Sequence, residues 1–352
     1  MGRFTAKRVI PVVTGLTLTL LLAACGGGQV TGSNSSGGST SGGATSAKGT
    51  KSFSVAFTSA GVSSAPFLAA LDQLRSQGYT IKTPTLAESE LVTAGTAKGK
   101  FAFGSGAASS VLLANSKGAN LKIVVDRVSN EWTLYARKDI KKCSDLGGRR
   151  LAIHSPGAVS TAMVKNYVQT NCSGTNPNYV VIAGSSNRLA ALLANRIDAS
   201  PLELSDGVTL EKEAGDRYSL LSSFSQDLPK LHPTPIYVNG DFAQQNPGTV
   251  TAVVKAVLKQ DRKIAGDPQY LEEIAKKYVP KAVDPKTIDA VAKKYVDLKL
   301  FDVNGGLTKS NLEYLARFFG PKGAGVVDQT VPVGEFADLS YLHKALDELG
   351  RK

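Results

Sequence analysis

The sequence predicts an α/β fold with mainly parallel sheets, arranged in two lobes. Beyond Lys51, short runs rich in β-branched and aromatic residues alternate with helical stretches, a pattern typical of parallel sheets. The length of 352 residues is enough for two compact lobes. A short internal echo, residues 98–103 against residues 194–199, also agrees with two related halves, although two unrelated turns would look the same.

The predicted elements follow in chain order. The strands are Phe53–Phe57, Phe101–Phe103, Leu121–Val125, Trp132–Arg137, Leu151–Ile153, Tyr179–Ile182, Ile197–Ser200 and Pro235–Val238. The helices between them are Ala65–Gln77, Ala107–Lys117, Ala158–Thr170 and Arg188–Asn195. After Gln245 only helices are predicted, and they open at Asn246-Pro247, Asp267-Pro268 and Asp284-Pro285, because proline after an Asn or Asp cap is a helix start signal.

Composition excludes several other classes of protein. The chain is 42% hydrophobic and 20% charged, so it is neither wholly disordered nor fibrous. Its net charge is +12, but the basic residues are scattered and aromatic residues make up only 7%, so we expect no nucleic-acid partner. The only long apolar run lies at the extreme N-terminus, which excludes a protein with several membrane spans.

The N-terminal segment, residues 1–24, has the pattern of a secretory signal peptide. Arg3, Lys7 and Arg8 precede an uncharged, mostly apolar stretch from Ile10 to Ala24. An uncleaved anchor is the alternative, but the stretch is shorter than the roughly 20 apolar residues of a membrane-spanning helix. We therefore expect the chain to be exported and the segment to be removed.

The Leu-Ala-Ala-Cys tetrad that ends this segment, residues 22–25, resembles the lipobox of bacterial lipoproteins. In that class the cysteine is acylated, with palmitate among the acyl groups, and becomes the new N-terminus. The resemblance implies lipidation of Cys25 and attachment to the extracytoplasmic face of the cell membrane. Residues 25–50 are almost wholly small and polar, so we expect them to form a flexible tether.

Cys143 and Cys172 are the two remaining cysteines, and outside the reducing cytoplasm we expect them to pair. Cys143 stands before the predicted strand at residues 150–153, and Cys172 ends the helix predicted after it. A helix that returns antiparallel along its strand brings its C-terminus beside the start of the strand. Two free buried thiols are the alternative, because spacing alone does not fix the geometry.

Three stretches carry a family resemblance: Thr58–Ala70 with its Ala-Pro-Phe-Leu-Ala-Ala, Asp145–Ile153, and Leu192–Glu203. In these stretches the chain resembles the substrate-binding proteins of ABC importers, in the branch that includes sulfonate, taurine, nitrate and thiamine-precursor binders. Two positions depart from the family pattern, Asn195 where glycine is usual and Ala102 where aspartate is common.

The resemblance implies a periplasmic-binding-protein-like fold with two crossing strands and a C-terminal helical block. Residues 51–131 are expected to form the first part of lobe 1, residues 132–235 lobe 2 with the crossings, and residues 236–352 the return to lobe 1 and the C-terminal helices. Two such lobes would close on a ligand.

Four loops at predicted strand ends are candidate ligand contacts, because helix N-termini there expose N–H groups with partial positive charge. The first loop offers Ser59, Gly61, Ser63 and Ser64, the second Ser105 and Gly106, the third Ser155, Gly157 and Ser160, and the fourth Glu203. Helix capping is the alternative for the first loop and for Glu203. The second loop also matches two glycines of a dinucleotide-binding loop, but the leader directs the chain away from cytosolic NAD, so no cofactor is expected.

Trp132 and Arg188 are two further candidates. Trp132 is interpreted as a cleft wall that stacks on the ligand, with an ordinary core aromatic as the alternative. Arg188 would clamp a carboxylate or sulfonate, although surface exposure is the more common fate of such a residue. Because Glu203 and Arg188 favour ligands of opposite charge, the sequence leaves the charge of the ligand open.

Catalytic and metal chemistry have little support. No Gly-x-Ser-x-Gly pentad occurs, and the three histidines, His154, His232 and His343, lack metal-ligand spacing. His154 is expected to be a strand-end residue rather than a ligand contact. The chain is therefore expected to have no metal site and no enzymatic activity.

The resemblance implies a monomeric, lipid-anchored solute-binding protein that delivers a small polar organic ligand to an ABC importer permease and its ATPase. The expected ligand classes are sulfonate- or taurine-like compounds, nitrate and pyrimidine precursors, and the anchor is expected to be the only contact with the membrane. Two alternatives stay open, a secreted α/β enzyme that acts on a small polar substrate and a lipid-anchored ligand sensor.

Overall fold

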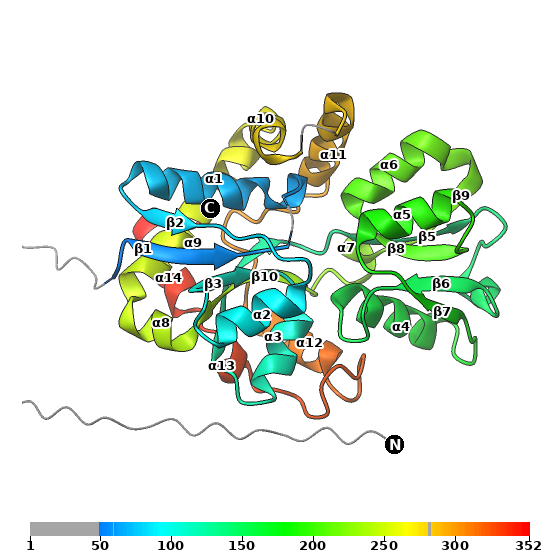
Figure 1. Ribbon diagram of the computed structural model, residues 1–352, viewed down its shortest axis with the longest axis horizontal. Helices are drawn as coiled ribbons and strands as arrows, with labels where there is room; N and C mark the ends of the chain where they lie inside the picture. The colour runs from blue at the N-terminus through cyan, green and yellow to red at the C-terminus, as the bar shows by residue number, and fades with distance from the viewer. Residues whose placement is uncertain (1–48, 59, 281–282) are drawn as a thin grey trace, which may run out of the picture. The chain divides into compact units, whose positions relative to one another are not determined.

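The computed structural model describes residues 49–58, 60–280 and 283–352 (Figure 1). The predicted signal peptide, Cys25 and the tether up to residue 48 lie outside the described residues, as does Ser59. Among the residues described, no helix combines the length and the apolar composition that crossing a membrane requires.

The first lobe is built on a five-stranded sheet with the order β2-β1-β3-β10-β4 (Figure 1). β1 pairs in parallel with β2 and β3, whereas β10 pairs antiparallel with β3 and β4. Every residue of the central strands β3 and β10 is buried, as expected where both faces of a sheet are covered. The strands are β1 (Ser52–Ala56), β2 (Thr80–Lys82), β3 (Phe103–Ser105), β4 (Leu121–Val128) and β10 (Thr234–Asn239).

The second lobe is built on another five-stranded sheet, with the order β7-β6-β8-β5-β9. β6 pairs in parallel with β7 and β8, and β5 pairs antiparallel with β8 and β9. The strands are β5 (Trp132–Arg137), β6 (Arg150–Ile153), β7 (Asn178–Val181), β8 (Ala199–Glu203) and β9 (Tyr218–Ser223).

The chain passes between the lobes twice. Residues 129–131 join β4 to β5, and residues 228–233 join α7 to β10. In each sheet four strands run in one direction, and the strand that follows a crossing, β5 or β10, runs opposite to them. The predicted two-lobed α/β fold is confirmed, with mixed sheets in which one strand opposes four.

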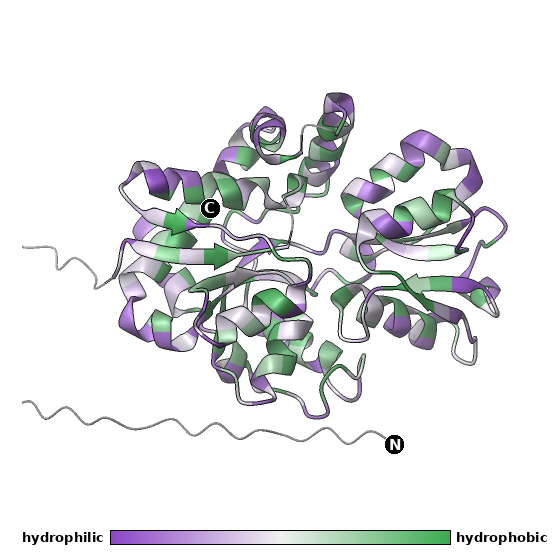
Figure 2. Ribbon diagram, viewed as in Figure 1, coloured by the Kyte–Doolittle hydropathy of each residue, from purple (hydrophilic) through white to green (hydrophobic). Residues whose placement is uncertain are grey.

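Helices cover both sheets, and their outward faces are the hydrophilic ones in Figure 2. α1 packs against α9, and α9 packs against α14. The helices are α1 (Ala65–Ser76), α2 (Ser89–Ala97), α3 (Ala108–Asn115), α4 (Val159–Asn171), α5 (Ser185–Leu193), α6 (Leu204–Ala214), α7 (Phe224–Asp227), α8 (Gly240–Gln245), α9 (Pro247–Gly266), α10 (Gln269–Tyr278), α11 (Pro285–Asp297), α12 (Lys309–Phe319), α13 (Val333–Phe336) and α14 (Ser340–Leu349). Three short 3₁₀ helices are η1 (Val62–Ser64), η2 (Cys143–Leu146) and η3 (Gly215–Arg217).

The three helices predicted after Gln245 are present as α9, α10 and α11. Asp284 caps α11 by accepting a hydrogen bond from the Lys286 N–H. Most of this block packs on the first lobe, but α11 also contacts α6 of the second lobe. There Lys212 Nζ lies 2.8 Å from Asp284 Oδ2, so one ion pair joins the two lobes away from the sheets.

Cys143 and Cys172 form a disulfide, as predicted. Cys143 begins η2, just before β6, and Cys172 follows the last residue of α4. Their Cα atoms lie 5.6 Å apart, within the ordinary range for a disulfide. The bond ties the end of α4 to the segment that enters β6.

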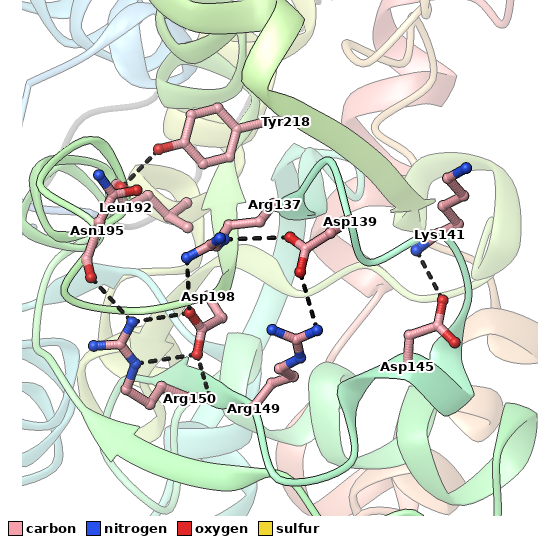
Figure 3. A network of polar contacts seen from close by, with 10 residues as sticks. All are labelled: Arg137, Asp139, Lys141, Asp145, Arg149, Arg150, Leu192, Asn195, Asp198 and Tyr218. Carbon is pink, nitrogen blue, oxygen red and sulfur yellow. Dashed lines mark hydrogen bonds and ion pairs between the residues drawn. The ribbon is translucent and has the colours of Figure 1, made fainter.

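Two of the stretches that carry the family resemblance meet at the start of β6 and β8 (Figure 3). Asp198 Oδ2 accepts hydrogen bonds from the backbone N–H and Nε of Arg150, at 2.8 and 3.0 Å, and Oδ1 accepts one from Nη2 at 2.9 Å. Arg150 Nη2 also donates to the Asn195 carbonyl oxygen at 3.0 Å. Asn195 has a φ of 55°, in the left-handed region where glycine and asparagine are favoured, so asparagine fits where the family usually has glycine.

Candidate functional site

A cavity of about 320 Å³ lies between the two lobes. It is lined from both sides by residues that follow the carboxyl ends of strands or begin helices, where open α/β sheets bind their ligands. The lining residues are Phe57, Thr58, Ala87, Glu88, Ser89, Glu90, Ser105, Gly106, Ala107, Arg127 and Thr234 from the first lobe, Glu131 from the first crossing, and Trp132, His154, Ala158, Val159, Ser160, Gly184, Ser185, Ser186, Asn187 and Glu203 from the second lobe.

Four helices begin at the cavity. α2 starts at Ser89, α3 follows Ala107, α4 starts at Val159 and α5 starts at Ser185, and all four of these residues line the cavity. The first turn of a helix leaves backbone N–H groups without helical partners. The cavity is therefore supplied with donors from both lobes.

The predicted site residues divide into two groups. The lining includes five of them, namely Ser105, Gly106, Trp132, Ser160 and Glu203. Their contact with a ligand stays a prediction. Six others, Gly61, Ser63, Ser64, Ser155, Gly157 and Arg188, do not line the cavity.

The first-loop residues Gly61, Ser63 and Ser64 form hydrogen bonds with other groups of the protein. Ser64 Oγ accepts a hydrogen bond from the Gly61 N–H at 2.9 Å and lies 3.0 Å from the Gly61 carbonyl oxygen. The Ser63 hydroxyl hydrogen-bonds the carboxylate of Glu131. Ser63 therefore acts at the cavity through Glu131, which lines it.

Ser155 joins the two lobes through Glu90, which lines the cavity. Its hydroxyl donates to Glu90 Oε1 at 2.7 Å, and Glu90 belongs to α2 of the first lobe. Gly157 lies nearby, and a Cβ atom built on it would be 3.8 Å from Leu113, a first-lobe side chain. Ser155 thus contacts the opposite lobe, and Gly157 lies close to it.

Arg188 is fully buried, so the expectation of surface exposure for it is wrong. Its Nε donates to the Pro201 carbonyl oxygen at 2.9 Å and its Nη1 to the Ile182 carbonyl oxygen at 3.2 Å. The guanidinium lies 5.8 Å from the centre of the Trp132 ring, within the range of a cation–π contact. Burial lowers the pKa of Arg188 to about 10. The side chain holds β8, the end of β7 and Trp132 together.

Two glutamates with raised pKa values, Glu131 and Glu203, line the cavity. Burial raises the pKa of Glu131, although Arg127 and a hydrogen bond from the Tyr295 hydroxyl oppose the shift. Burial also raises the pKa of Glu203 to about 8, and the negative charges of Glu131 and Asp206 add to this effect. Like charges in a low-dielectric site favour retention of a proton.

His154 lines the cavity at the end of β6, where it was expected as a strand-end residue. Its Nδ1 accepts a hydrogen bond from the Gly184 N–H at 3.3 Å. Burial and then the charge of Arg188 lower its pKa, so the imidazole is neutral at pH 7.

Sequence reasoning missed Arg127, Glu131, Glu88 and Glu90, which also line the cavity. Arg127 and Glu131 flank the first crossing, and their one signal was a charged pair beside Trp132. Glu88 and Glu90 lie at the start of α2, a helix that was not predicted. Among the residues that the structure describes, no group of three or more His, Cys, Asp or Glu side chains is placed to hold a metal ion.

Two lobes joined by two crossings, with a cavity between them, define a periplasmic-binding-protein-like fold. Solved structures share it. A ligand-binding component of an ABC-type import system from Staphylococcus aureus, solved with zinc bound, matches with a TM-score of 0.69 and 14% identity over 84% of this chain and 99% of that one. The alkanesulfonate-binding protein of Xanthomonas axonopodis, bound to MOPS, gives 0.63 and 16% over 82% and 98%. The nitrate-binding protein of Synechocystis gives 0.65 and 11% over 86% and 90%.

The NMT1/THI5-like family matches residues 75–270, more than half of the chain. The chain therefore belongs to the NMT1/THI5-like family, and the resemblance found in the sequence is confirmed. Among curated protein sequences none matches. The expectation of a binding protein rather than an enzyme agrees with the family and with the binding proteins that share the fold.

Proposed function

We propose that this chain is the extracytoplasmic solute-binding protein of an ABC importer, anchored to the membrane by lipidated Cys25. It captures a small polar organic ligand and delivers it to a permease whose ATPase drives uptake. The observation that carries the proposal is the cavity between the lobes, which polar side chains and four helix starts line from both sides. A site divided between two lobes suits a ligand that holds them together.

The ligand would bind by stabilising the closed arrangement of the lobes. The first lobe with the C-terminal helices, residues 51–128 and 234–352, would move as one body and residues 132–227 as the other, with the crossings as hinges. A ligand shifts this equilibrium only by the difference in its contacts with the two states. The hydrogen bond from Ser155 to Glu90 and the ion pair between Lys212 and Asp284 are inter-lobe contacts that closure would form.

The proposed ligands are small polar molecules, among them sulfonate- or taurine-like compounds, nitrate and pyrimidine precursors. The family membership and the fold shared with sulfonate- and nitrate-binding proteins support this range. The protein is proposed to act as a monomer, because one chain supplies both walls of the cavity.

The test is uptake of a labelled ligand by cells that carry or lack the gene. The compound is first identified by its effect on the thermal stability of the purified protein and is recovered after binding. Loss of uptake on deletion, with the bound compound recovered unchanged, supports an importer component. Conversion of the compound would point to an enzyme, and a signalling defect with normal uptake would point to a sensor.

A further inference from the structure

The cavity lining carries more acidic than basic side chains. Glu88, Glu90, Glu131 and Glu203 line it, whereas Arg127 is the one lysine or arginine in the lining. His154 adds no positive charge at neutral pH, because burial lowers its pKa. If all four glutamates were ionised, the lining would hold an excess of three negative charges, which disfavours an anion.

The two arginines nearest the cavity differ in how a ligand could reach them. Arg127 lines the cavity, and its Nη2 lies 3.9 Å from Glu131 Oε1, whose negative charge offsets its own. Its Nε has no hydrogen-bond partner in the described structure. Arg188 is buried outside the lining and donates to two backbone carbonyl oxygens, as described above. A bidentate clamp on a sulfonate or carboxylate would therefore depend on Arg127 alone, beside the charge of Glu131.

Glu203 differs from Glu131 in its partners. Glu131 accepts hydrogen bonds from Tyr295 and Ser63. The carboxylate of Glu203 has no hydrogen bond or ion pair within the described part of the chain, although the residue is largely buried and lines the cavity. The carboxylate oxygens of Glu203 are therefore open to a donor supplied by the ligand, which would form a charge-assisted hydrogen bond with them.

Other groups at the cavity suit the rest of such a ligand. Trp132 lines the cavity beside Glu203, with which it pairs across β5 and β8, and an indole face attracts cations. The hydroxyl of Ser105, in the first lobe, is buried in the lining and has no hydrogen-bond partner in the described structure. It is a second unpaired polar group that a ligand can meet.

We propose that the ligand carries a cationic N–H group, an ammonium or an amidinium, that binds the carboxylate of Glu203 with Glu131 beside it. This inference rests on the proposed function and selects among its ligand classes. Zwitterions and amines fit, whereas simple anions such as nitrate and plain sulfonates do not. The volume of about 320 Å³ limits the ligand to a small molecule.

Binding of a cation is coupled to loss of a proton from Glu203. The groups around this carboxyl are Glu131 at the first crossing, Asp206 on α6, Arg127 on β4, Arg188 on α5 and Tyr295 on α11. Together with burial they hold its pKa near 8 when the site is empty. Below that pH, a cation must displace the proton, so its affinity rises with pH, by at most about tenfold per pH unit.

The experiment compares two pairs of probes by titration calorimetry on the detergent-solubilised full-length protein at pH 6, 7 and 8. Taurine and ethanesulfonate differ only in the ammonium group, and benzamidine and benzoate differ in the sign of their charge. We expect taurine and benzamidine to bind at least about tenfold more tightly than their partners. Benzamidine binding should strengthen as the pH rises and should release protons to the buffer.

Glu203→Gln keeps the shape of the side chain but removes its charge, so it should weaken benzamidine binding by about tenfold or more and abolish the proton release. Glu213→Gln on the same lobe is the control, because Glu213 is an exposed residue of α6. Glu203→Asp should restore part of the affinity. Circular dichroism shows whether each variant is folded.

Tighter binding of either anion, weaker cation binding at higher pH, or no binding of either cationic probe at 10 mM would overturn the inference. An anionic probe that binds and is recovered unchanged would leave the proposed function standing. That function fails separately, if deletion of the gene leaves uptake unchanged.

Discussion

Glu203 shows how one side chain joins folding to binding. It ends β8 and pairs with Trp132, so the sheet places its carboxyl at the cavity. Ser105 and Trp132 are placed by strands in the same way. Ser105 and Glu203 could be predicted because a polar residue at the carboxyl end of a predicted strand lies at the edge of a sheet. Trp132 could be predicted because it begins the strand that follows the first crossing.

Glu131 and Arg127 could not be predicted in this way. They lie in the largely polar stretch from Asp126 to Glu131, beyond the end of the predicted strand Leu121–Val125. Glu131 is buried because Tyr295, 164 residues further along the chain, covers it. Contacts over such separations leave no local pattern in the sequence.

At the residue scale, Glu203→Gln should change how stability depends on pH. The unfolded chain releases the Glu203 proton near pH 4.5, whereas the folded protein keeps it up to about pH 8, because its pKa is raised. The wild-type free energy of unfolding should therefore fall over this range, by up to about 1.4 kcal/mol per pH unit from this group. The variant should lack this contribution. Urea unfolding at pH 5 and pH 8 measures it, and identical pH profiles for the two proteins would contradict the assignment.

Arg188 supports a second prediction at this scale. Arg188→Met keeps a long side chain but leaves the Pro201 and Ile182 carbonyl oxygens without their donor. We expect a loss of about 2 to 4 kcal/mol in the free energy of unfolding. Arg188→Lys should recover part of it. If Arg188→Met unfolds at the wild-type urea concentration, the guanidinium does not hold these strands.

At the scale of elements, the sequence predicted those with strong local signals. α9 and α11 begin at Pro247 and Pro285, where proline after a cap marks a helix start. β2 was missed because only one of its three residues, Ile81, is apolar and buried. β9 was missed because Tyr218–Ser223 has a mixed burial pattern on an edge strand, so its hydrophobic alternation is weak.

The disulfide gives a prediction for one element. It closes the segment that contains β6 and α4, and the two cysteines are separated by 29 residues in the sequence. The double variant Cys143→Ser/Cys172→Ser should lose about 3 kcal/mol in the free energy of unfolding, because the unfolded chain gains conformational freedom. Chemical denaturation of the variant and of the oxidised wild type measures the loss. Equal stability would show that the bond adds nothing to the fold.

At the scale of the whole molecule, length and the alternation of elements were enough to predict two lobes. Which residues face each other across the cavity could not be predicted, because this depends on how the two crossings set one sheet against the other. The predicted N-terminal leader, residues 1–24, lies outside the described residues. The leader is expected to determine where the protein is located, whereas ligand binding depends on the cavity lined by residues from 57 onward.

Lipidation can be tested on the whole molecule. Cys25→Ser removes the thiol that would be acylated, so the protein should move from the membrane fraction to the soluble fraction. Its ligand binding should be unchanged, because the cavity is formed by residues from 57 onward. Fractionation and immunoblotting measure this. A variant that stays in the membrane fraction would favour an uncleaved anchor.

The measurement that tests the central claim most directly is a fluorescence titration of Trp132, the only tryptophan in the chain. Any compound that raises the melting temperature should also change the Trp132 emission saturably, with the same dissociation constant, because Trp132 lines the cavity between the lobes. The compound should be recovered unchanged. A stabilising compound that leaves the emission of Trp132 unaltered would place the binding site elsewhere and contradict the account.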